Sequence, residues 1–308
     1  MIGAMLLAAI CFAAGPYPLQ FGIPEVKVVS KIPKKDRDCA IVIPGDASTY
    51  IYEEESDYYA SYQRSYFAIT QQKGGWDCMR HYEILANGCI PYFLNLENCA
   101  ADTLVLLPKN LILEAMQLPG VIPPVRGKPL RIDHHRFNKQ RYNELLEKIL
   151  DHTRRHLTTR HIAHHILHTI GYRGAGSVLY LSSEVSPDYM RECMLIGLRE
   201  ELGERLVDYP KIDYLYTSYA EDVKKLYGKG FSYTKVLEDI PINREEIEGR
   251  IRNHEFDLIV YGSVHRGLPF HDLVQQIYNS NEIVYICGED GHRCVYSAWN
   301  QLFLREWR

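Results

Sequence analysis

Short apolar runs recur along the chain, at intervals that fit strands alternating with helices. β-Branched and aromatic residues are continuous within several of these runs, which is typical of strands buried on both faces of a parallel sheet. The predicted strands are residues 39–44, 65–70, 90–94, 177–182, 256–262, 282–288 and 302–306. The alternation of strands with helical segments predicts an α/β fold.

Helical periodicity fills the intervals between these runs. Residues 137–150 and 157–172 form a helical block near the middle of the chain. A later helix is expected to begin with Ser186 as N-cap and Pro187 at its first position, and to end at Gly203.

Three glycines in residues 171–176 interrupt this helical pattern, because closely spaced glycines disfavour a continuous helix. We therefore predict a boundary at this point. The expected organisation is an apolar N-terminal segment, a first domain and a second domain, at residues 1–15, 16–172 and 173–308.

Composition and charge narrow the classes of partner. The chain has 308 residues, of which 46% are hydrophobic and 24% are charged, as in an ordinary globular protein. The formal net charge is −4, so no global basic field attracts nucleic acid. We therefore expect no nucleic-acid partner.

Two features bear on the cellular compartment. The eight cysteines are scattered and contain no C-x-x-C pair, which favours reduced thiols and a cytoplasmic location. Residues 1–15 are apolar with an A-x-A-like end, but they carry no Lys or Arg and are short for a membrane span of about 20 residues. A signal or membrane anchor at residues 1–15 is the alternative to an apolar linker or a start-site artefact, so membrane association or secretion stays open.

The stretch "KGGWDCMRHYEILANGCIPYF", residues 73–93, carries the densest chemistry. It follows a predicted strand, and a helix is expected to begin at or just before Asp77. Helix N-termini at the carboxyl edge of a parallel sheet bind anions, and Gly74 and Gly75 would let a diphosphate approach the backbone. Lys73 and Arg80 would add positive charge.

Glu83 follows Arg80 by three residues, which places both side chains on one helix face. An Arg that reaches a phosphate and a carboxylate that accepts from ribose hydroxyls would suit a nucleotide sugar. The alternative is a surface ion pair on a helix that ends at Gly88. Spacing alone favours the surface pair.

The run "RHYEILANGCIP" resembles the donor-domain motif of exostosin-like glycosyltransferases of the glycosyltransferase-B fold, over about 30 residues. This resemblance implies two Rossmann-like domains facing a cleft and a nucleotide-sugar substrate. It implies Glu83 as the ribose ligand, Arg80 and Lys73 near the diphosphate, and a turn into the next strand at Gly88. It implies neither a metal nor a cofactor.

One departure from the motif bears on stereochemistry. Retaining members of the fold often carry a second Glu eight positions before the first, where this chain has Gly75. The sequence therefore favours an inverting transfer to a hydroxyl acceptor, which would belong to a glycan, a protein or a small molecule.

The order of the domains looks reversed relative to that family, because "VLYLSSEVSPDYM" resembles the opening of an acceptor domain but lies in the second half. We interpret the chain as circularly permuted. This interpretation predicts that residues 17–22 and 303–307 lie near each other at the domain cleft.

An inverting transfer needs a base that takes the proton of the acceptor hydroxyl. Loops that follow strands of the second domain supply the candidates Glu184, Asp188 and His265. Asp188 also suits the first turn of a helix whatever its function, because a carboxylate there is favourable to the helix dipole. Asp290 and His292 follow a later strand and are further candidates, but they could instead only shape a turn.

Two further patterns have structural interpretations. In "RHIAHHILH" the apolar residues gather on one helix face and the histidines on the opposite face, so we favour a solvated face over a zinc site. The tyrosine-rich, acidic run 49–66 is interpreted as a solvated lead-in rather than a sugar-stacking surface.

Three function classes follow from these patterns. The first is a glycosyltransferase that moves a sugar from a nucleotide to a hydroxyl group. The second is a nucleotide-sugar epimerase or hydrolase on the same architecture. The third is a nucleotide- or carbohydrate-binding protein without catalysis.

Overall fold

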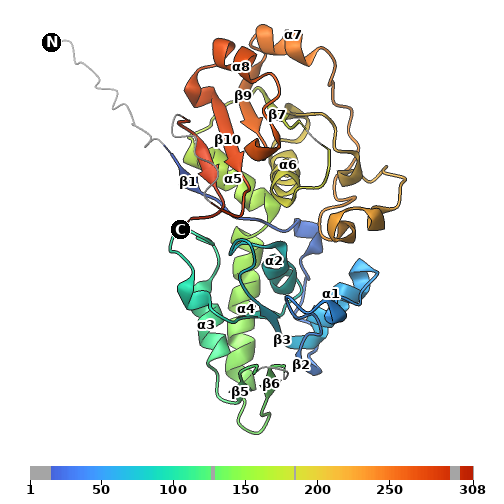
Figure 1. Cartoon of the computed structure of the whole chain (residues 1–308), viewed down its shortest axis with the longest axis vertical. Coiled ribbons are helices and arrows are strands. Elements are labelled where there is room, and N and C mark those ends of the chain that lie inside the picture. Colours follow the sequence, from blue (N-terminus) through green and yellow to red (C-terminus); the bar gives the residue numbers. More distant parts are fainter. Residues whose placement is uncertain (1–14, 126–128, 184, 292–298, 308) are drawn as a thin grey trace, which may run out of the picture.

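The computed structural model describes residues 15–125, 129–183, 185–291 and 299–307. Its elements form a larger and a smaller parallel sheet, each with helices (Figure 1). The predicted α/β fold is confirmed. The predicted segment 1–15 falls outside the described residues except for Gly15.

The larger sheet has six strands in the order β1-β11-β10-β9-β7-β8, and every neighbouring pair is parallel. The strands are β1 (Tyr17–Pro18), β7 (Ser177–Leu181), β8 (Leu206–Tyr209), β9 (Phe256–Tyr261), β10 (Ile283–Cys287) and β11 (Leu302–Leu304). Because β7, β9, β10 and β11 lie within the predicted runs, apolar continuity located four of the six strands; β1 and β8 were not predicted.

Helices cover both faces of this sheet, and the side chains alternate between them. Val178 and Tyr180 of β7 join the core that contains α5 (Thr159–Thr169) and α6 (Tyr189–Leu202). The intervening Leu179 joins the core on the other face, under α7 (Ile247–Arg252) and α8 (His271–Ile277). Burial on both faces explains why these strands are continuously apolar.

The smaller sheet has the parallel order β2-β3-β4. It comprises β2 (Arg37–Cys39), β3 (Ser65–Thr70) and β4 (Ile90–Phe93), and a two-stranded antiparallel unit of β5 (Val121–Ile122) and β6 (Arg131–Ile132) lies beyond it. The remaining helices are α1 (Glu55–Arg64), α2 (Met79–Ala86), α3 (Lys109–Met116) and α4 (Lys139–His156). β3 is buried along its whole length.

Two local predictions differ from the structure. Residues 40–44 continue past β2 without strand pairing of their own, although Ala40 still donates to the Phe67 carbonyl at 2.9 Å. The N-cap of α6 is Asp188 rather than Ser186, because the Asp188 carboxylate accepts from the N–H groups of Met190 and Arg191. Gly203 ends the helix with a positive φ of 58°, as expected.

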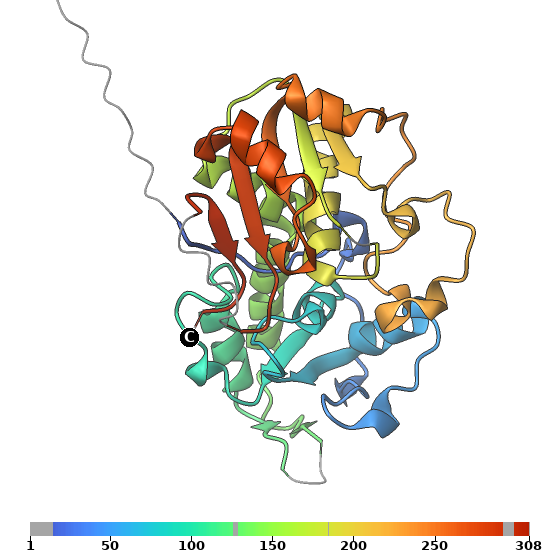
Figure 2. The same cartoon turned by 45° about the horizontal axis from the view of Figure 1, so that its top comes forward.

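The two ends of the described chain lie side by side. Tyr17 pairs with Phe303 in the parallel β1–β11 ladder, and the Leu19 N–H donates to the Leu304 carbonyl at 2.8 Å. Figure 2 shows β11 running beside this N-terminal strand at one edge of the larger sheet. The predicted proximity of residues 17–22 and 303–307 is confirmed; the circular permutation that suggested it stays a prediction.

The histidine-rich helix α5 has the predicted polarity. Ile162, Ala163 and Ile166 are buried, whereas His161 and His164 are exposed. The histidines line a shallow surface cavity of about 260 Å³ together with Arg155 and Leu106. Among the described residues, no group of three or more His, Cys, Asp or Glu side chains is arranged to hold a metal ion.

The cysteines only partly follow the expectation of reduced thiols. Cys39, Cys78, Cys89, Cys99 and Cys193 are free. Cys287, at the end of β10, is disulfide-bonded. The absence of C-x-x-C pairs therefore did not predict its oxidation state, because disulfide formation depends on which side chains the fold brings together.

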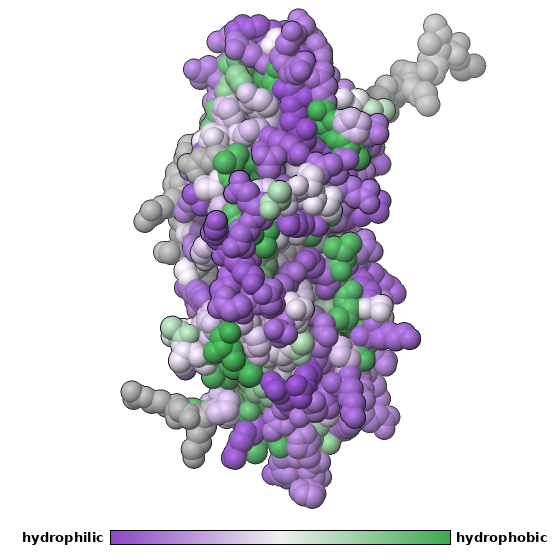
Figure 3. Space-filling model, turned by 90° about the vertical axis from the view of Figure 1, so that its right-hand side faces the viewer, coloured by the Kyte–Doolittle hydropathy of each residue, from purple (hydrophilic) through white to green (hydrophobic). Residues whose placement is uncertain are grey.

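The surface and the helices both bear on contact with membranes. Figure 3 shows a mostly hydrophilic side of the molecule with small, separate hydrophobic patches. Within the part of the chain that the structure describes, no helix combines the length and the apolarity needed to cross a bilayer.

Candidate functional site

A cavity of about 430 Å³ lies between the two sheets and is lined by both halves of the chain. From here the first half means residues 15–172 and the second half means residues 173–307. The first half contributes the β3–α2 loop, the start of α2 and part of the tyrosine-rich run. The second half contributes Tyr189, residues 227–229, Phe231, Asp290 and Arg305.

The start of α2 opens onto this cavity. The helix begins at Met79 with Cys78 as N-cap, and no described side chain caps it by a hydrogen bond. Cys78, Met79 and Arg80 line the cavity. The unpaired N–H groups of a first helical turn and the positive end of its dipole favour an anion.

The helix was expected to begin at or just before Asp77, but that side chain has other partners. Asp77 accepts from the Phe21 N–H at 2.7 Å and from the Tyr82 hydroxyl at 2.8 Å. It is therefore committed to joining the N-terminal segment to α2, and Cys78 takes the N-cap position.

Two cations converge at the mouth of the cavity on Tyr50. Arg80 Nη2 donates to the Tyr50 hydroxyl at 2.8 Å, and Lys73 Nζ lies 3.3 Å from the same oxygen. Burial by itself would raise the pKa of Tyr50, but the two cations lower it overall. This arrangement concentrates positive charge next to the start of α2.

Glu83 lies one turn further along α2 and also lines the cavity, with only 6% of its surface exposed. It accepts hydrogen bonds from the Tyr58 hydroxyl at 2.8 Å and from Ser232 Oγ at 2.5 Å. Burial raises the pKa of Glu83, although the hydrogen bonds from Ser232 and Tyr58 oppose this effect.

The surface ion pair that spacing alone favoured is not formed. Glu83 is buried, and among the described residues no ion pair joins it to Arg80. The two side chains share a helix face as predicted, but that face lines the cavity between the sheets.

Gly74 and Gly75 line the cavity, but the space beside their Cα atoms is filled by the second half. A Cβ on Gly74 would lie 3.1 Å from Asp290 Cγ, and one on Gly75 would lie 2.6 Å from Glu306 Cδ. Glu306 is held there because it accepts from the Asp77 N–H at 2.7 Å. The glycines thus allow the two halves to pack closely.

This packing predicts opposite effects for two Gly→Ala substitutions. Gly75→Ala should lower the free energy of unfolding by about 1–3 kcal/mol, because the new methyl group overlaps a buried carboxyl group. Gly249→Ala should raise it by roughly 0.5–1 kcal/mol, because Gly249 lies inside α7 with no described atom within 4 Å of a Cβ. Urea unfolding measures both, and a neutral Gly75→Ala would contradict the packing.

Gly88 lies at the other end of α2 and does not line the cavity. Its φ is +61°, and its N–H donates to the Leu85 carbonyl at 3.0 Å. Lys35 Nζ donates to the Gly88 carbonyl. The geometry of Gly88 therefore serves the turn from α2 into β4 rather than contact with a ligand in the cavity.

Arg305 of the second half binds the end of the β3–α2 loop, although sequence patterns did not single this residue out. Its Nη1 donates to the Asp77 carbonyl at 2.5 Å, its Nη2 donates to the Gly288 carbonyl at 2.7 Å, and it pairs with Asp290. Its guanidinium lies over the Phe21 ring, 4.7 Å from the centroid.

The burial of Asp77 predicts a pH-dependent stability. Burial raises the pKa of Asp77 to about 6, although Arg305 and Tyr82 oppose the shift. The folded chain thus keeps this proton to higher pH than the unfolded chain, whose aspartates titrate near pH 4. The contribution of Asp77 to the free energy of unfolding is therefore complete below about pH 4 and is lost as the pH rises through about 6.

Asp77→Asn should therefore reduce the fall in unfolding free energy between pH 4 and 7 by roughly 3 kcal/mol. Urea unfolding at several pH values measures this slope. The exposed change Asp102→Asn is the control and should leave the slope as in the wild type. Equal slopes in the wild type and Asp77→Asn would contradict the assignment.

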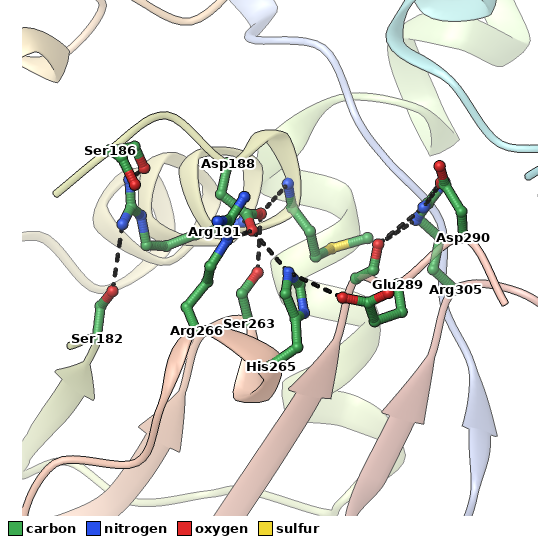
Figure 4. A network of polar contacts seen from close by, with 12 residues as sticks. Ser182, Ser186, Asp188, Arg191, Ser263, His265, Arg266, Glu289, Asp290 and Arg305 are labelled. Atoms are coloured by element: carbon green, nitrogen blue, oxygen red, sulfur yellow. Dashed lines mark hydrogen bonds and ion pairs between the residues drawn. The ribbon is translucent and has the colours of Figure 1, made fainter. Parts of the chain in front are cut away.

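A second polar cluster lies at the carboxyl ends of β7 and β9 (Figure 4). Asp188 Oδ2 lies 3.0 Å from His265 Nε2 and accepts from Arg266 Nε at 3.0 Å. Its Oδ1 accepts from Ser263 Oγ at 2.8 Å. Burial alone would raise the pKa of Asp188, but the hydrogen bonds from His265, the Arg191 N–H and Arg266 hold it well below its usual range.

This cluster gives Asp188 and His265 different chemical capacities. Asp188 is surrounded by donors and stays ionised, so it is a weak proton acceptor and a good partner for an imidazole. His265 Nδ1 is buried and has no hydrogen-bond partner among the described residues. His265 does not line the cavity, but its Nε2 lies 3.6 Å from Glu289, the neighbour of the cavity residue Asp290.

Two candidates from the sequence fall outside the described residues, namely Glu184 and His292. The structure adds residues that the sequence analysis did not single out as site residues or interpreted otherwise. Tyr50, Tyr52 and Tyr58 line the cavity rather than forming a solvated lead-in. Ser232 reaches Glu83 from the second half. The nearby run "YGKGF", residues 227–231, is a glycine-rich signal that could have drawn attention to this segment.

Comparisons of the chain with protein-family models, with curated proteins and with solved structures find no match.

Proposed function

We propose that the protein is a glycosyltransferase that moves a sugar from a nucleotide to a hydroxyl group, with inversion and without a metal ion. In this proposal, two Rossmann-like domains, residues 16–172 and 173–308, face a cleft in the manner of the glycosyltransferase-B fold. The observation that carries it is the joint placement of a helix start without a described side-chain cap, Lys73, Arg80 and the buried Glu83 along one cavity between the halves.

The cavity has the dimensions and the chemistry for a nucleotide donor. Its volume of about 430 Å³ lies within the range of small-molecule sites. The start of α2 with Lys73 and Arg80 would hold the diphosphate, and Glu83 would accept from the ribose hydroxyls. The aromatic side chains of Tyr52 and Phe231 offer flat apolar surfaces for the base.

His265 is the proposed base, and Asp188 positions it. Nδ1 is buried in the structure, so the loop after β9 would have to move before the acceptor can reach it. With Nε2–H donated to Asp188, the lone pair of Nδ1 would then take the proton of the acceptor hydroxyl. The acceptor oxygen would bond to the anomeric carbon as the bond from that carbon to the diphosphate breaks. The positive charge at the start of α2 would stabilise the leaving diphosphate.

A thermal-shift screen tests the donor site. Nucleoside diphosphates and their sugars should raise the melting temperature, because a ligand at 100 times its Kd stabilises the folded state by about 2.7 kcal/mol. Nucleoside monophosphates should stabilise less, because they lack one phosphate group. If no nucleotide changes the melting temperature, and calorimetry also detects no binding, the proposed function is wrong.

One observation favours a nucleotide-binding protein without transfer as the second candidate: His265 lies outside the lining of the cavity. Product analysis separates the candidates. Transfer to an acceptor supports the glycosyltransferase, and conversion of the donor without an acceptor indicates an epimerase or hydrolase. Binding without conversion across an acceptor panel supports the second candidate.

A further inference from the structure

Residues 224–232 of the second half lie against the first half, and we name this segment the strap. Figure 2 shows it beside α1. Lys224 pairs with Glu54, and Lys229 Nζ lies 2.6 Å from Glu53. The Ser232 N–H donates to Glu55 Oε1 at 2.6 Å. The strap is thus attached to the acidic start of α1.

The end of the strap reaches Glu83 itself. Ser232 is fully buried, and its Oγ donates to Glu83 Oε1 at 2.5 Å. Ser232 Oγ also lies 2.8 Å from the Tyr59 hydroxyl. Tyr58 binds the other oxygen of Glu83. Two protein hydroxyl groups therefore occupy the carboxylate, and a ribose would present two hydroxyl groups of the same chemistry.

The strap backbone is sharply turned. Lys229 has a φ of 57° and Ser232 a φ of 76°, in the left-handed region that L-residues with side chains rarely adopt. Gly228 and Gly230 share this conformation. Such conformations persist where surrounding contacts hold them, and they recur in segments that switch.

The contacts of the strap differ in strength. The ion pairs of Lys224 and Lys229 involve carboxylates that are 56% and 69% exposed, so each contributes little and is weakened by salt. The hydrogen bond from Ser232 to Glu83 is buried and charge-assisted, which makes it the stronger attachment. The Ser232 N–H also donates to the Glu55 carboxylate, so opening depends mainly on replacing the contacts of Ser232.

We propose that the strap is a closing element of the donor cavity, and that Ser232 holds Glu83 until a ribose hydroxyl displaces it. The displacement rests on the proposed function, because it requires a nucleotide at Glu83. The salt-sensitive attachment of the strap does not require one, so the two parts are tested separately.

Amide hydrogen exchange of the full chain tests the attachment. The double change Lys224→Gln and Lys229→Gln should raise exchange rates within the strap roughly fivefold, and about 0.5 M NaCl should do the same in the wild type. Lys225→Gln is the matched control, because Lys225 is exposed and neighbours Lys224. Equal strap exchange in the double variant and the wild type would overturn the attachment.

Calorimetric titration with UDP, GDP and ADP tests the displacement. Ser232→Ala should bind the preferred nucleotide about five- to tenfold more tightly, because the ligand no longer replaces the serine hydroxyl. Ser232→Gly, which suits the left-handed backbone, should do the same, and the exposed change Ser30→Ala should match the wild type. Unchanged or weaker affinity in both Ser232 variants overturns the displacement.

A further result separates the two proposals. If none of the three nucleotides binds the wild type or either variant, the proposed function fails and the displacement fails with it. The exchange measurement then still decides whether the strap is attached as proposed.

Discussion

Glu83→Gln should weaken the binding of nucleoside diphosphates about 10- to 100-fold. The amide group keeps one acceptor oxygen but loses the charge, and a hydrogen bond to a charged group contributes roughly 1.5–3 kcal/mol. Calorimetric titration with the nucleotide that gives the largest thermal shift measures this effect. It is the largest expected effect on binding, because Glu83 is the buried acid on the α2 face of the cavity.

The control for this substitution is Glu147→Gln, an identical change at an exposed position of α4. It should leave the affinity unchanged. Melting temperatures of both variants show whether the chain still folds, since the new amide oxygen can still accept from either Tyr58 or Ser232. Wild-type affinity in a folded Glu83→Gln variant would remove the ribose role from Glu83.

His265→Gln should lower the rate of sugar transfer by about 100- to 10,000-fold, the usual contribution of a general base. Nucleotide affinity should stay at the wild-type value, because His265 does not line the cavity. Asp188→Asn should also slow transfer while keeping α6 capped, because Asn is an equally good N-cap. Initial rates with the preferred donor and an acceptor panel measure both variants.

His254→Gln is the matched control, since His254 is 47% exposed and pairs with Glu282 away from the Asp188 cluster. Its transfer rate should equal that of the wild type. If His265→Gln transfers sugar at the wild-type rate, the proton goes to another group. If neither the wild type nor any variant transfers sugar, the second candidate, a nucleotide-binding protein without transfer, gains support.

The strands of the larger sheet show what local patterns can predict. Residues 256–262 were expected as a strand, and β9 spans Phe256–Tyr261 with five of its six residues buried. Continuous apolar character comes from burial on both faces, which is a property of each strand's own sequence. Residues 40–44 have the same character, but they run through a bend into a turn and form no ladder of their own.

Helix starts were less predictable, because capping side chains also have distant partners. Asp77 looked like a helix start but is taken by Phe21, 56 positions away. Asp188 displaced Ser186 as the N-cap of α6, and the loop after β9 supplies three further partners for its carboxylate. A local pattern shows that a carboxylate suits a cap, but it does not show what competes for that carboxylate.

The candidate site divides in the same way. Local spacing and the resemblance singled out Lys73, Arg80 and Glu83, and the structure places all three along one cavity. They came together because one loop and one helix carry them. Ser232 contacts Glu83 across 149 positions, and the Arg305–Asp77 contact spans 228 positions, so no local pattern could indicate either.

By itself, the sequence determined the α/β class, the strands β7, β9, β10 and β11 of the larger sheet and the polarity of the histidine-rich helix, because apolar periodicity reflects burial that each element needs wherever it packs. Only the tertiary structure decided that Glu83 is buried in a cavity rather than paired on the surface. It also decided that two carboxylates fill the space beside the glycines and that Ser232 of the strap contacts Glu83. These outcomes depend on how the two halves pack against each other, and contacts between distant segments leave no period in a single sequence.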